Sequence, residues 1–326
     1  MSDAPHLLIP LAASPAPGCQ QTLKDLPLPH LDRLLARLSQ VSKDRGEETD
    51  FSPPHERALA RELQLPVSHG GITPWAAWQQ QQKQGQVGVD SAGDNAWGYI
   101  TPCQWHVTTD HITMLDPLEL QLTPDSSRAL MAIFAPWFAE DGIELSYDTP
   151  TRWIARGDAF EGLACASLDR IILRDVRAWM PHSQNPEHAR LLHRLQSEMQ
   201  MLLYTHPIND ARAESDLPPV NTFWVHGAGR LGTPVPKQST APQMPTTLLE
   251  PAIRGDWRSW AEAWRALDAG PIAALEAQVA GGAKATLTLC GELNSLRFEA
   301  QERSFGQKIK SLFAKPQRFV DLQNQL

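Results

Sequence analysis

The hydrophobic pattern near the start of the chain predicts a short strand followed by helices. Residues 7–11 form an apolar run that is typical of a buried strand. In the stretch LPHLDRLLARLSQ, Leu31, Leu34, Leu35 and Leu38 recur at the spacing of one helical face. A second helix is expected over residues 54–63, with Ser52 as its N-cap and prolines in its first turn. Residues 79–95 are rich in glutamine and glycine, which predicts an exposed loop.

The middle of the chain, from residue 96 to residue 224, combines strand patterns with two long helices. WGYITPCQWHVTT and GIELSYDTPTRWIAR predict strands, the latter pair meeting at residues 148–150. A helix is predicted between Thr123, as N-cap, and Gly142, as its stop. The stretch EHARLLHRLQSEMQMLLYTH predicts a long amphipathic helix. Strands followed by a long helix indicate a compact α+β unit.

The last third begins with a proline-rich connection. Residues 232–250 hold four prolines and the polar run KQST, which favours a linker or a long surface loop. Beyond it, DWRSWAEAWRALD and PIAALEAQVAGG predict helices, and ATLTLCG and LRFEAQ predict strands. A final helix is expected near GQKIKSLFA.

Charge and composition exclude some classes of partner. The 326 residues carry a formal net charge of -8, which disfavours nucleic-acid binding because phosphate neutralisation needs a basic surface. Asp3 stands where a signal peptide needs positive charge, and Pro10 interrupts the apolar run that follows. No apolar run approaches the ~20 residues of a membrane helix. The four cysteines are scattered, without a CxxC pair. We therefore expect a cytoplasmic protein with reduced thiols and without membrane or nucleic-acid partners.

A glycine-rich string follows the strand-like segment VNTFWV. Gly227, Gly229 and Gly232 match GxGxxG, but a dinucleotide site needs these glycines to lead into a helix. Pro234 and Pro236 follow instead, and proline so placed blocks a helix. The string therefore predicts a tight turn or a glycine nest for one anion.

Histidines in HVTTDH invite a metal interpretation that spacing does not favour. On a strand, His106 and Asp110 would share a face but lie roughly 13 Å apart, and His111 would face the other way. His188 and His193 are five residues apart on a predicted helix, which is not a chelating spacing. We interpret these histidines as structural or solvent-facing.

Arginines at positions 170, 174 and 177 would form one stripe if their segment were a helix. Arginine forks suit phosphate or carboxylate ligands. Asp169 and Asp175 lie close in sequence and are alternative partners. Ligand binding and a salt-bridged surface both remain open for this segment.

The stretch THPINDARAESDLPPVNTFWVHGAGR concentrates polar residues around turn-forming prolines. Its candidate residues are His206, Asn209, Asp210, Arg212, Asn221 and His226. Such groups could line a pocket beside a helix end and a strand end. They could equally form a hydrogen-bonded connector, because Asn and Asp satisfy backbone groups in turns.

This stretch resembles the HPxNxxRxxxxxxPxNxxxxxGxG segment of archaeal-type, cofactor-independent phosphoglycerate mutases. LPLPHLDRLLARL resembles that family's TPNLDxLAxxG, and AWGYITPCQWHVTT and GIELSYDTPTRWIAR fall where its inserted domain should lie. The whole chain resembles a bacterial branch of phosphoglycerate mutase-like proteins described as the regulatory protein RpfE type. The resemblance spans roughly residues 6–230.

The resemblance implies an α/β fold, with a reduced alkaline-phosphatase-like core that holds an inserted α+β domain. The implied core comprises residues 1–78 and 251–326, the loop residues 79–95, the insertion residues 96–226 and the Gly/Pro-rich linker residues 227–250. The resemblance also implies an ancestor that transferred a phosphoryl group through a phosphoserine with two metal ions.

The sequence departs from the family pattern at the metal ligands. The family's first strand ends in an Asp-Gly turn that binds metal, whereas LLIPLAAS has no acidic residue. The later half of the family supplies Asp and His ligands, yet no histidine follows His226. A two-metal site needs ligands that hold both ions about 3.5–4 Å apart. We therefore expect no bound metal; the alternative is two divalent ions such as manganese or zinc.

The leading hypothesis is a mutase-like protein that has lost its metal site and has a regulatory or ligand-sensing role. The expected ligand is a small anionic or phosphorylated molecule, and a protein partner is also compatible with a regulatory role. The residues expected to line its site are His206, Asn209, Arg212, Asn221, Gly227, Gly229 and Arg152. An active mutase or phosphatase with a rearranged site, and a protein-interaction scaffold, are the alternatives.

Overall fold

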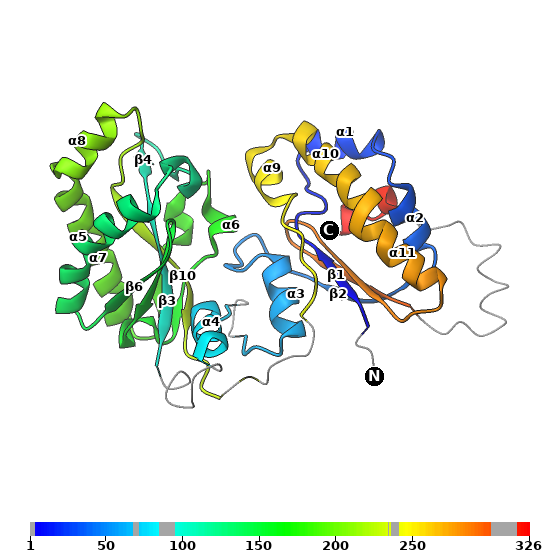
Figure 1. The fold of residues 1–326 in the computed structure, drawn as a ribbon, viewed down its shortest axis with the longest axis horizontal. Coiled ribbons are helices and arrows are strands. Elements are labelled where there is room, and N and C mark those ends of the chain that lie inside the picture. The colour runs from blue at the N-terminus through cyan, green and yellow to red at the C-terminus, as the bar shows by residue number, and fades with distance from the viewer. Residues whose placement is uncertain (1–3, 68–71, 85–94, 234, 236–240, 301–317) are drawn as a thin grey trace. The chain divides into compact units, whose positions relative to one another are not determined.

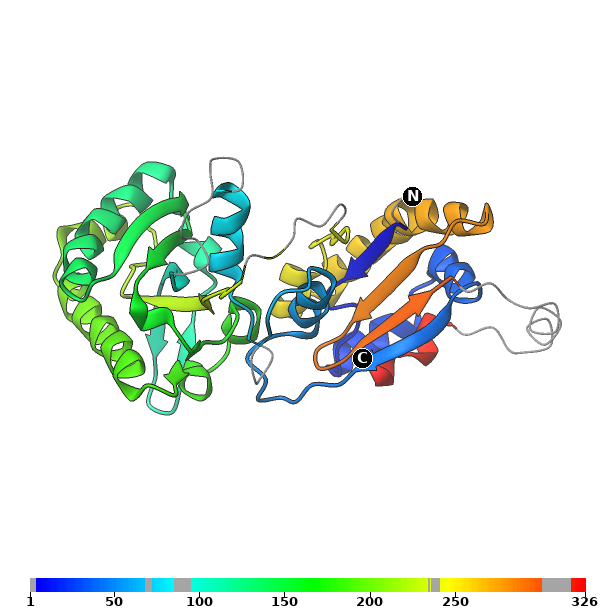
Figure 2. The ribbon, with the colours of Figure 1, turned by 90° about the horizontal axis from the view of Figure 1, so that it is seen from below.

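The computed structural model describes residues 4–67, 72–84, 95–233, 235, 241–300 and 318–326. The chain separates into two compact units (Figures 1 and 2). Unit 1 comprises Met1–Thr49, Pro53–Leu63 and Gln238–Leu326, and unit 2 comprises Asp50–Ser52 and Gln64–Lys237. The middle of the chain thus forms one unit, and the two ends together form the other.

Unit 1 is a four-stranded sheet with helices on both faces. Its strand order is β1 (His6–Ile9), β11 (Thr286–Cys290), β12 (Ser295–Glu299) and β2 (Ser39–Asp44). The pair β1–β11 is parallel and the other pairs are antiparallel. The helices of the larger core are α1 (Pro17–Lys24), α2 (Pro29–Leu35), α10 (Trp257–Leu267) and α11 (Ala273–Ala280), with α9 (Leu249–Arg254) at its margin.

Strand alternation explains how both faces of this sheet are buried. Leu7 and Ile9 of β1 pack into the core formed with α1, α2, α10 and α11. Between them, Leu8 points to the other face and meets Ala58 of α3 (Pro54–Glu62). Successive side chains of a strand face opposite ways, so a short continuous apolar run covers both faces.

Unit 2 is built on a four-stranded antiparallel sheet. Its strand order is β10 (Thr222–Gly229), β3 (Trp97–Cys103), β7 (Arg152–Arg156) and β6 (Glu144–Thr149). Phe223 and Val225 of β10 face the core with helices α5 (Pro124–Glu140) and α7 (Pro186–Tyr204), whereas Trp224 faces a second cluster. Helix α4 (Trp75–Gln84) places Ala76 against Tyr99 and Ile154.

Unit 2 also contains two small two-stranded sheets. One pairs β4 (Trp105–Val107) with β5 (Ile112–Met114), and the other pairs β8 (Leu163–Ala164) with β9 (His182–Ser183). Helix α8 (Pro207–Glu214) follows α7 directly. Among the described residues, no helix combines the length and the apolar character needed to cross a lipid bilayer.

Most elements expected from the pattern are confirmed. Thr123 caps α5 by accepting the Ser126 N–H at 3.1 Å, and the helix ends before Gly142, whose φ is 71°. Strands β6 and β7 meet near residues 148–150, and α7 matches the amphipathic stretch. The mixed α/β class is therefore confirmed. The expected final helix near residues 306–314 lies outside the described residues.

Several local expectations were wrong. A loop was expected from residue 79, but helix α4 extends to Gln84. The helix is held by Ala76 and Ala77, which are fully buried. The rest of the expected loop, residues 85–94, lies outside the described residues. Pro53, not Ser52, is the N-cap residue of α3. The polar strand β2 and helix α1 were not anticipated.

The arginine stripe and the HVTTDH strand are also corrected. Helix α6 spans only Leu168–Ile171, and Leu173 adopts a φ of 60°, so Arg170, Arg174 and Arg177 do not share one helix face. HVTTDH turns back on itself: β4 and β5 pair His106 with Thr113.

The grouping of residues differs from the boundaries expected from the sequence. Helix α4, expected within the N-terminal part of the core and the loop after it, folds with unit 2. Strand β10 continues to Gly229, past the expected boundary at residue 226. Sheet pairing of this strand with β3 is the reason, because Gly229 still lies opposite Trp97.

Candidate functional site

The polar segment between α7 and β10 forms a hydrogen-bonded connector. His206 is the N-cap of α8, and its Nδ1 accepts the Ile208 N–H at 3.1 Å. Asn209 donates through Nδ2 to the carbonyls of Leu203 and Val220, at 2.9 and 2.8 Å. Its Oδ1 accepts the Val220 N–H at 2.9 Å. One asparagine thus ties the end of α7 to the strand that follows the connector.

Arg212 and Asn221 continue the same pattern. The Arg212 guanidinium donates to the Pro218 carbonyl at 2.7 Å and to the Leu120 carbonyl at 2.6 Å. Burial lowers the pKa of Arg212 from its ordinary value. Asn221 accepts the Trp105 N–H and donates to the Trp105 carbonyl, both at 2.8 Å, which extends the strand pairing beyond β10. The groups that would orient a ligand are thereby engaged with backbone.

The glycine string at the end of β10 forms a bulge that admits helix α4. Gly227 has a φ of 58° and Gly229 a φ of 142°, and the pairing with β3 shifts register between residues 226 and 229. A Cβ on Gly227 would lie 2.8 Å from the Tyr99 ring and 3.1 Å from the Trp75 Cβ. The glycines therefore form a bulge within β10 and not the tight turn expected from the sequence, and their positive φ values permit close packing.

Replacing Gly227 by alanine is expected to lower the free energy of unfolding of unit 2 by about 2 kcal/mol, since the new methyl group adds a steric clash to the left-handed backbone cost. Gly232→Ala is the matched control, because Gly232 has a φ of 73° and, apart from its chain neighbours, no described residue has an atom within 4 Å of its Cβ position. The control should lose about 1 kcal/mol. Urea unfolding followed by tryptophan fluorescence measures both; equal losses would contradict the packing role.

Arg152 belongs to a cluster on the α4 face of the unit 2 sheet. Its Nε donates to Asp148 at 2.9 Å, and its guanidinium lies 4.8 Å from the centre of the Tyr99 ring. Asp148 also accepts from Lys83 at 2.7 Å. Tyr99 packs on His226 at a centroid distance of 5.1 Å. Arg152 therefore already has an acidic partner at the position where an anion contact was expected.

His226 is held neutral in this cluster. Its Nε2 lies 3.1 Å from the Thr101 hydroxyl. Burial, followed by the positive charge of Arg152, lowers the pKa of His226 to about 3. The unfolded chain takes up this proton near the ordinary pKa of about 6.5. Between these pKa values the unfolded state binds more protons, so stability falls as the pH falls.

We therefore expect unit 2 to lose up to about 2 kcal/mol of stability between pH 7.5 and pH 5 through His226. His226→Gln should flatten this part of the pH dependence, whereas replacing the exposed His111 by glutamine should leave it in place. Urea midpoints measured across this pH range provide the test. A wild-type slope that survives His226→Gln would assign the effect to other groups.

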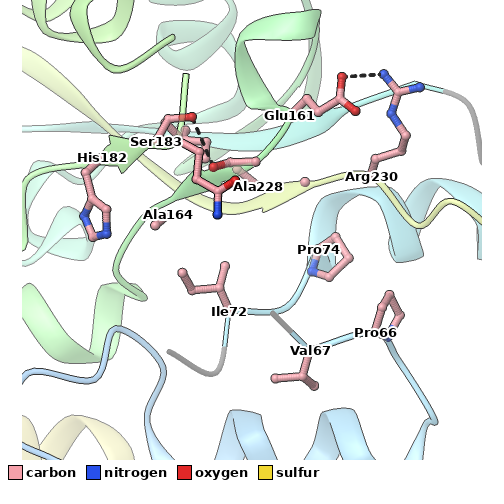
Figure 3. A pocket seen from close by; sticks show the side chains of 14 residues that line it. Pro66, Val67, Ile72, Pro74, Glu161, Ala164, His182, Ser183, Ala228 and Arg230 are labelled. Atoms are coloured by element: carbon pink, nitrogen blue, oxygen red, sulfur yellow. Dashed lines mark hydrogen bonds and ion pairs between the residues drawn. The ribbon is translucent and has the colours of Figure 1, made fainter. Parts of the chain in front are cut away.

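A cavity of about 570 Å³ lies in unit 2 beside the end of β10 (Figure 3). It lies between β8 and β9, the end of β10, and the chain segments around residues 66–67 and 72–74. Most of its lining is apolar. The polar side chains at its border are Glu161, His182, Ser183, Gln184 and Arg230.

The charged part of the cavity border is a single ion pair. Arg230 donates to the Glu161 carboxylate at 2.9 Å. Figure 3 shows this pair on one side of the cavity and His182 on the other. Ser183 donates to the Gly162 carbonyl and accepts the Asn185 N–H, both at 3.2 Å. Of the residues expected at a ligand site, Gly229 lines this cavity, and its neighbour Arg230 supplies the positive charge.

The ligand-binding role of the expected residues stays a prediction. The structure places His206, Asn209, Arg212 and Asn221 in the connector, Arg152 in the aromatic cluster and Gly229 at the cavity. They do not meet in one site. Glu161, His182 and Arg230 were not anticipated, although Arg230 stands inside the glycine string.

The residues at the end of β1 do not fit the two-metal site that the family resemblance implies. Residues 10–13 follow this strand with the sequence PLAA, which offers no side-chain ligand, and Ala12 and Ala13 are buried. Among the described residues of each unit taken by itself, no three side chains of His, Cys, Asp or Glu lie close enough together to hold one metal ion. We therefore derive no chemical step through metal ions.

No known protein family and no curated protein matches the sequence of this chain. Solved structures are similar to it, among them the following two. The cofactor-independent phosphoglycerate mutase from Thermoplasma acidophilum aligns over 92% of this chain and 90% of its own, with 12% identity and a TM-score of 0.35. The PH0037 protein from Pyrococcus horikoshii aligns over 99% and 98%, with 12% identity and a TM-score of 0.42. The similarity is distant and assigns no activity to this chain.

Proposed function

We propose that this chain is a cytoplasmic, phosphoglycerate mutase-like protein of the RpfE regulatory type that senses a small anionic ligand and has lost its two-metal site. In this proposal, unit 1 is a reduced alkaline-phosphatase-like core and unit 2 carries the ligand site. The observation that carries the proposal is the cavity beside Gly229, with Arg230 at its border.

The chemistry of the donor groups supports sensing over phosphoryl transfer. Phosphoryl transfer relies on several positive charges that stabilise the transferred group. The cavity has one arginine, which is already paired with Glu161, and no lysine in its lining. The residues that follow strand β1, PLAA at positions 10–13, include no acidic side chain, whereas the resembled family has an acidic metal ligand after its first strand. A binding site needs only the cavity and one oriented charge.

The first experiment separates the sensor from an active enzyme. The full chain is purified, its metal content is measured by elemental analysis, and interconversion of 2- and 3-phosphoglycerate is assayed with added manganese. We expect less than one metal ion per chain and no turnover. Stoichiometric metal with turnover that a chelator abolishes would overturn the proposal and favour a mutase with a rearranged site.

A second experiment separates the sensor from an interaction scaffold. The variant Ala164→Phe places a large side chain at the cavity wall. A sensor should lose stabilisation by small anions in a thermal shift assay, while its circular dichroism spectrum is unchanged. Failure of every small anion to stabilise the wild-type chain would favour the scaffold.

A further inference from the structure

The wall of the unit 2 cavity is apolar over most of its extent. Its apolar lining comes from Pro66, Val67, Ile72, Pro74, Leu163 and Ala164, together with Ala228. A volume of about 570 Å³ lies in the range of pockets that enclose small organic molecules. A ligand with a polar body would lose its hydrogen bonds to water against these side chains without replacement. The wall therefore selects a ligand with an apolar body.

The Arg230–Glu161 pair limits the charge that the cavity accepts. A guanidinium has five N–H donors, and the hydrogen bond from Arg230 to Glu161, at 2.9 Å, uses one of them. Its Nε is buried without a hydrogen-bond partner among the described residues. The side chain as a whole is 32% exposed, so the rest of the guanidinium remains accessible. Arg230 therefore retains capacity for a second acceptor.

The negative charge of Glu161 favours a ligand whose acceptor group carries one negative charge over a ligand with two. The ion pair has no net charge, because Glu161 balances Arg230. A carboxylate with one negative charge is therefore repelled less by Glu161 than a phosphate with about two negative charges. On the opposite side, His182 packs its ring on Phe51 at 5.1 Å and lines the cavity. Arg230 is the one lysine or arginine among the described residues that line the cavity, so the carboxylate of a bound molecule would face the Arg230 side (Figure 3).

From these features we infer that the cavity binds an apolar monocarboxylate, with its hydrocarbon or aromatic body between Ile72, Pro74 and Leu163 and its carboxylate at Arg230. This inference rests on the proposed sensing function and specifies its ligand class. Phosphoglycerates do not belong to this class, because they carry a phosphate and a carboxylate on a short polar body.

Calorimetric titration of the full chain tests this ligand class. The probes are octanoate and 3-phenylpropionate, their neutral primary amides, and 3-phosphoglycerate. We expect one carboxylate to bind per chain, the matching amide to bind at least tenfold more weakly, and 3-phosphoglycerate to give no heat of binding. The amide retains the apolar body, so the difference reports the charge at Arg230.

Variants locate the binding. Arg230→Gln should weaken carboxylate binding at least tenfold and leave amide binding within about twofold, since it removes only the cation. Arg156→Gln is the matched control, because Arg156 pairs with Glu144 on β6 and does not line the cavity. Ala164→Phe should abolish binding of both probes. Circular dichroism spectra establish that each variant is folded.

The outcomes separate this inference from the proposed function. Binding of 3-phosphoglycerate, with no binding of the monocarboxylates, would overturn the ligand class and leave the sensing function intact. Carboxylate binding that both Arg230→Gln and Ala164→Phe leave unchanged would overturn the site. Absence of binding by every probe would overturn the inference, and turnover with bound metal would overturn the proposed function as well.

Discussion

Replacement of Arg212 by methionine is expected to lower the free energy of unfolding of unit 2 by about 4 kcal/mol. The side chain is 7% exposed and holds two backbone carbonyls, those of Pro218 and Leu120. Methionine fills similar space but leaves both carbonyls without a donor. A hydrogen bond from a charged donor contributes about 1.5–3 kcal/mol, so two of them give the expected loss.

Hydrogen–deuterium exchange measures this effect best, because a chain of two units need not unfold in one transition. Protection should fall in α8 and β10 and remain unchanged in β1 and β11 of unit 1. Arg190→Met is the matched control, since Arg190 forms an exposed pair with Glu187 on α7. This control should change stability by less than about 0.5 kcal/mol. Equal protection in both variants would show that the connector does not depend on Arg212.

Replacement of Asp268 by alanine is expected to lower the free energy of unfolding of unit 1 by about 3 kcal/mol. Asp268 begins the π-helical turn Asp268–Ile272 after α10 and is 4% exposed. Its carboxylate accepts the N–H groups of His30 and Leu31, at 3.2 and 2.8 Å, in the first turn of α2. It thereby caps a helix distant in sequence and places negative charge at its N-terminus.

Two further variants test the origin of this loss. Asp268→Asn keeps one acceptor oxygen and should lose only about 1 kcal/mol. Glu262→Ala, which removes an exposed partner of Arg258 on α10, should have an effect below about 0.5 kcal/mol. Exchange protection of α2 amides reports the cap directly. A loss in Asp268→Ala that spares α2 would contradict the capping role.

The sequence pattern predicted those helices and strands whose start and stop residues lie within the element or directly beside it. Helix α5 has a capping Thr123, a proline in its first turn and Gly142 after its end, so its bounds follow from local chemistry. Strand β2 lacks such a signal: it is polar, half of its residues are exposed, and among the described strands it pairs with β12 alone. Its strand conformation comes from pairing with a segment distant in the sequence, and the hydrophobic pattern of residues 39–44 gives no indication of this pairing.

From the sequence, only the part of the candidate site that lies within one continuous segment could be predicted. The glycine string predicted a tight turn, and the structure instead has a bulge with positive φ values at Gly227 and Gly229. The cavity needed residues from β8, β9 and β10 and from the segments near Pro66 and Pro74 to meet, which is a property of the fold. Polar side chains such as Asn209 are equally suited to hold backbone or ligand, and only their contacts distinguish these roles.

The edge strand β1 contacts the segments of unit 1 on both sides of the long interruption at residues 64–237. Helix α3, whose Ala58 packs on Leu8, ends shortly before Gln64, where the long segment of unit 2 begins. After unit 2 ends at Lys237, Gln243 returns to accept the Leu8 N–H at 2.9 Å and to donate to the His6 carbonyl at 2.8 Å. Unit 1 is thus anchored to one strand on both sides of the interruption. Because these contacts lie within unit 1, changes in the length or sequence of the intervening segment are expected to leave the pairing of the unit 1 sheet intact.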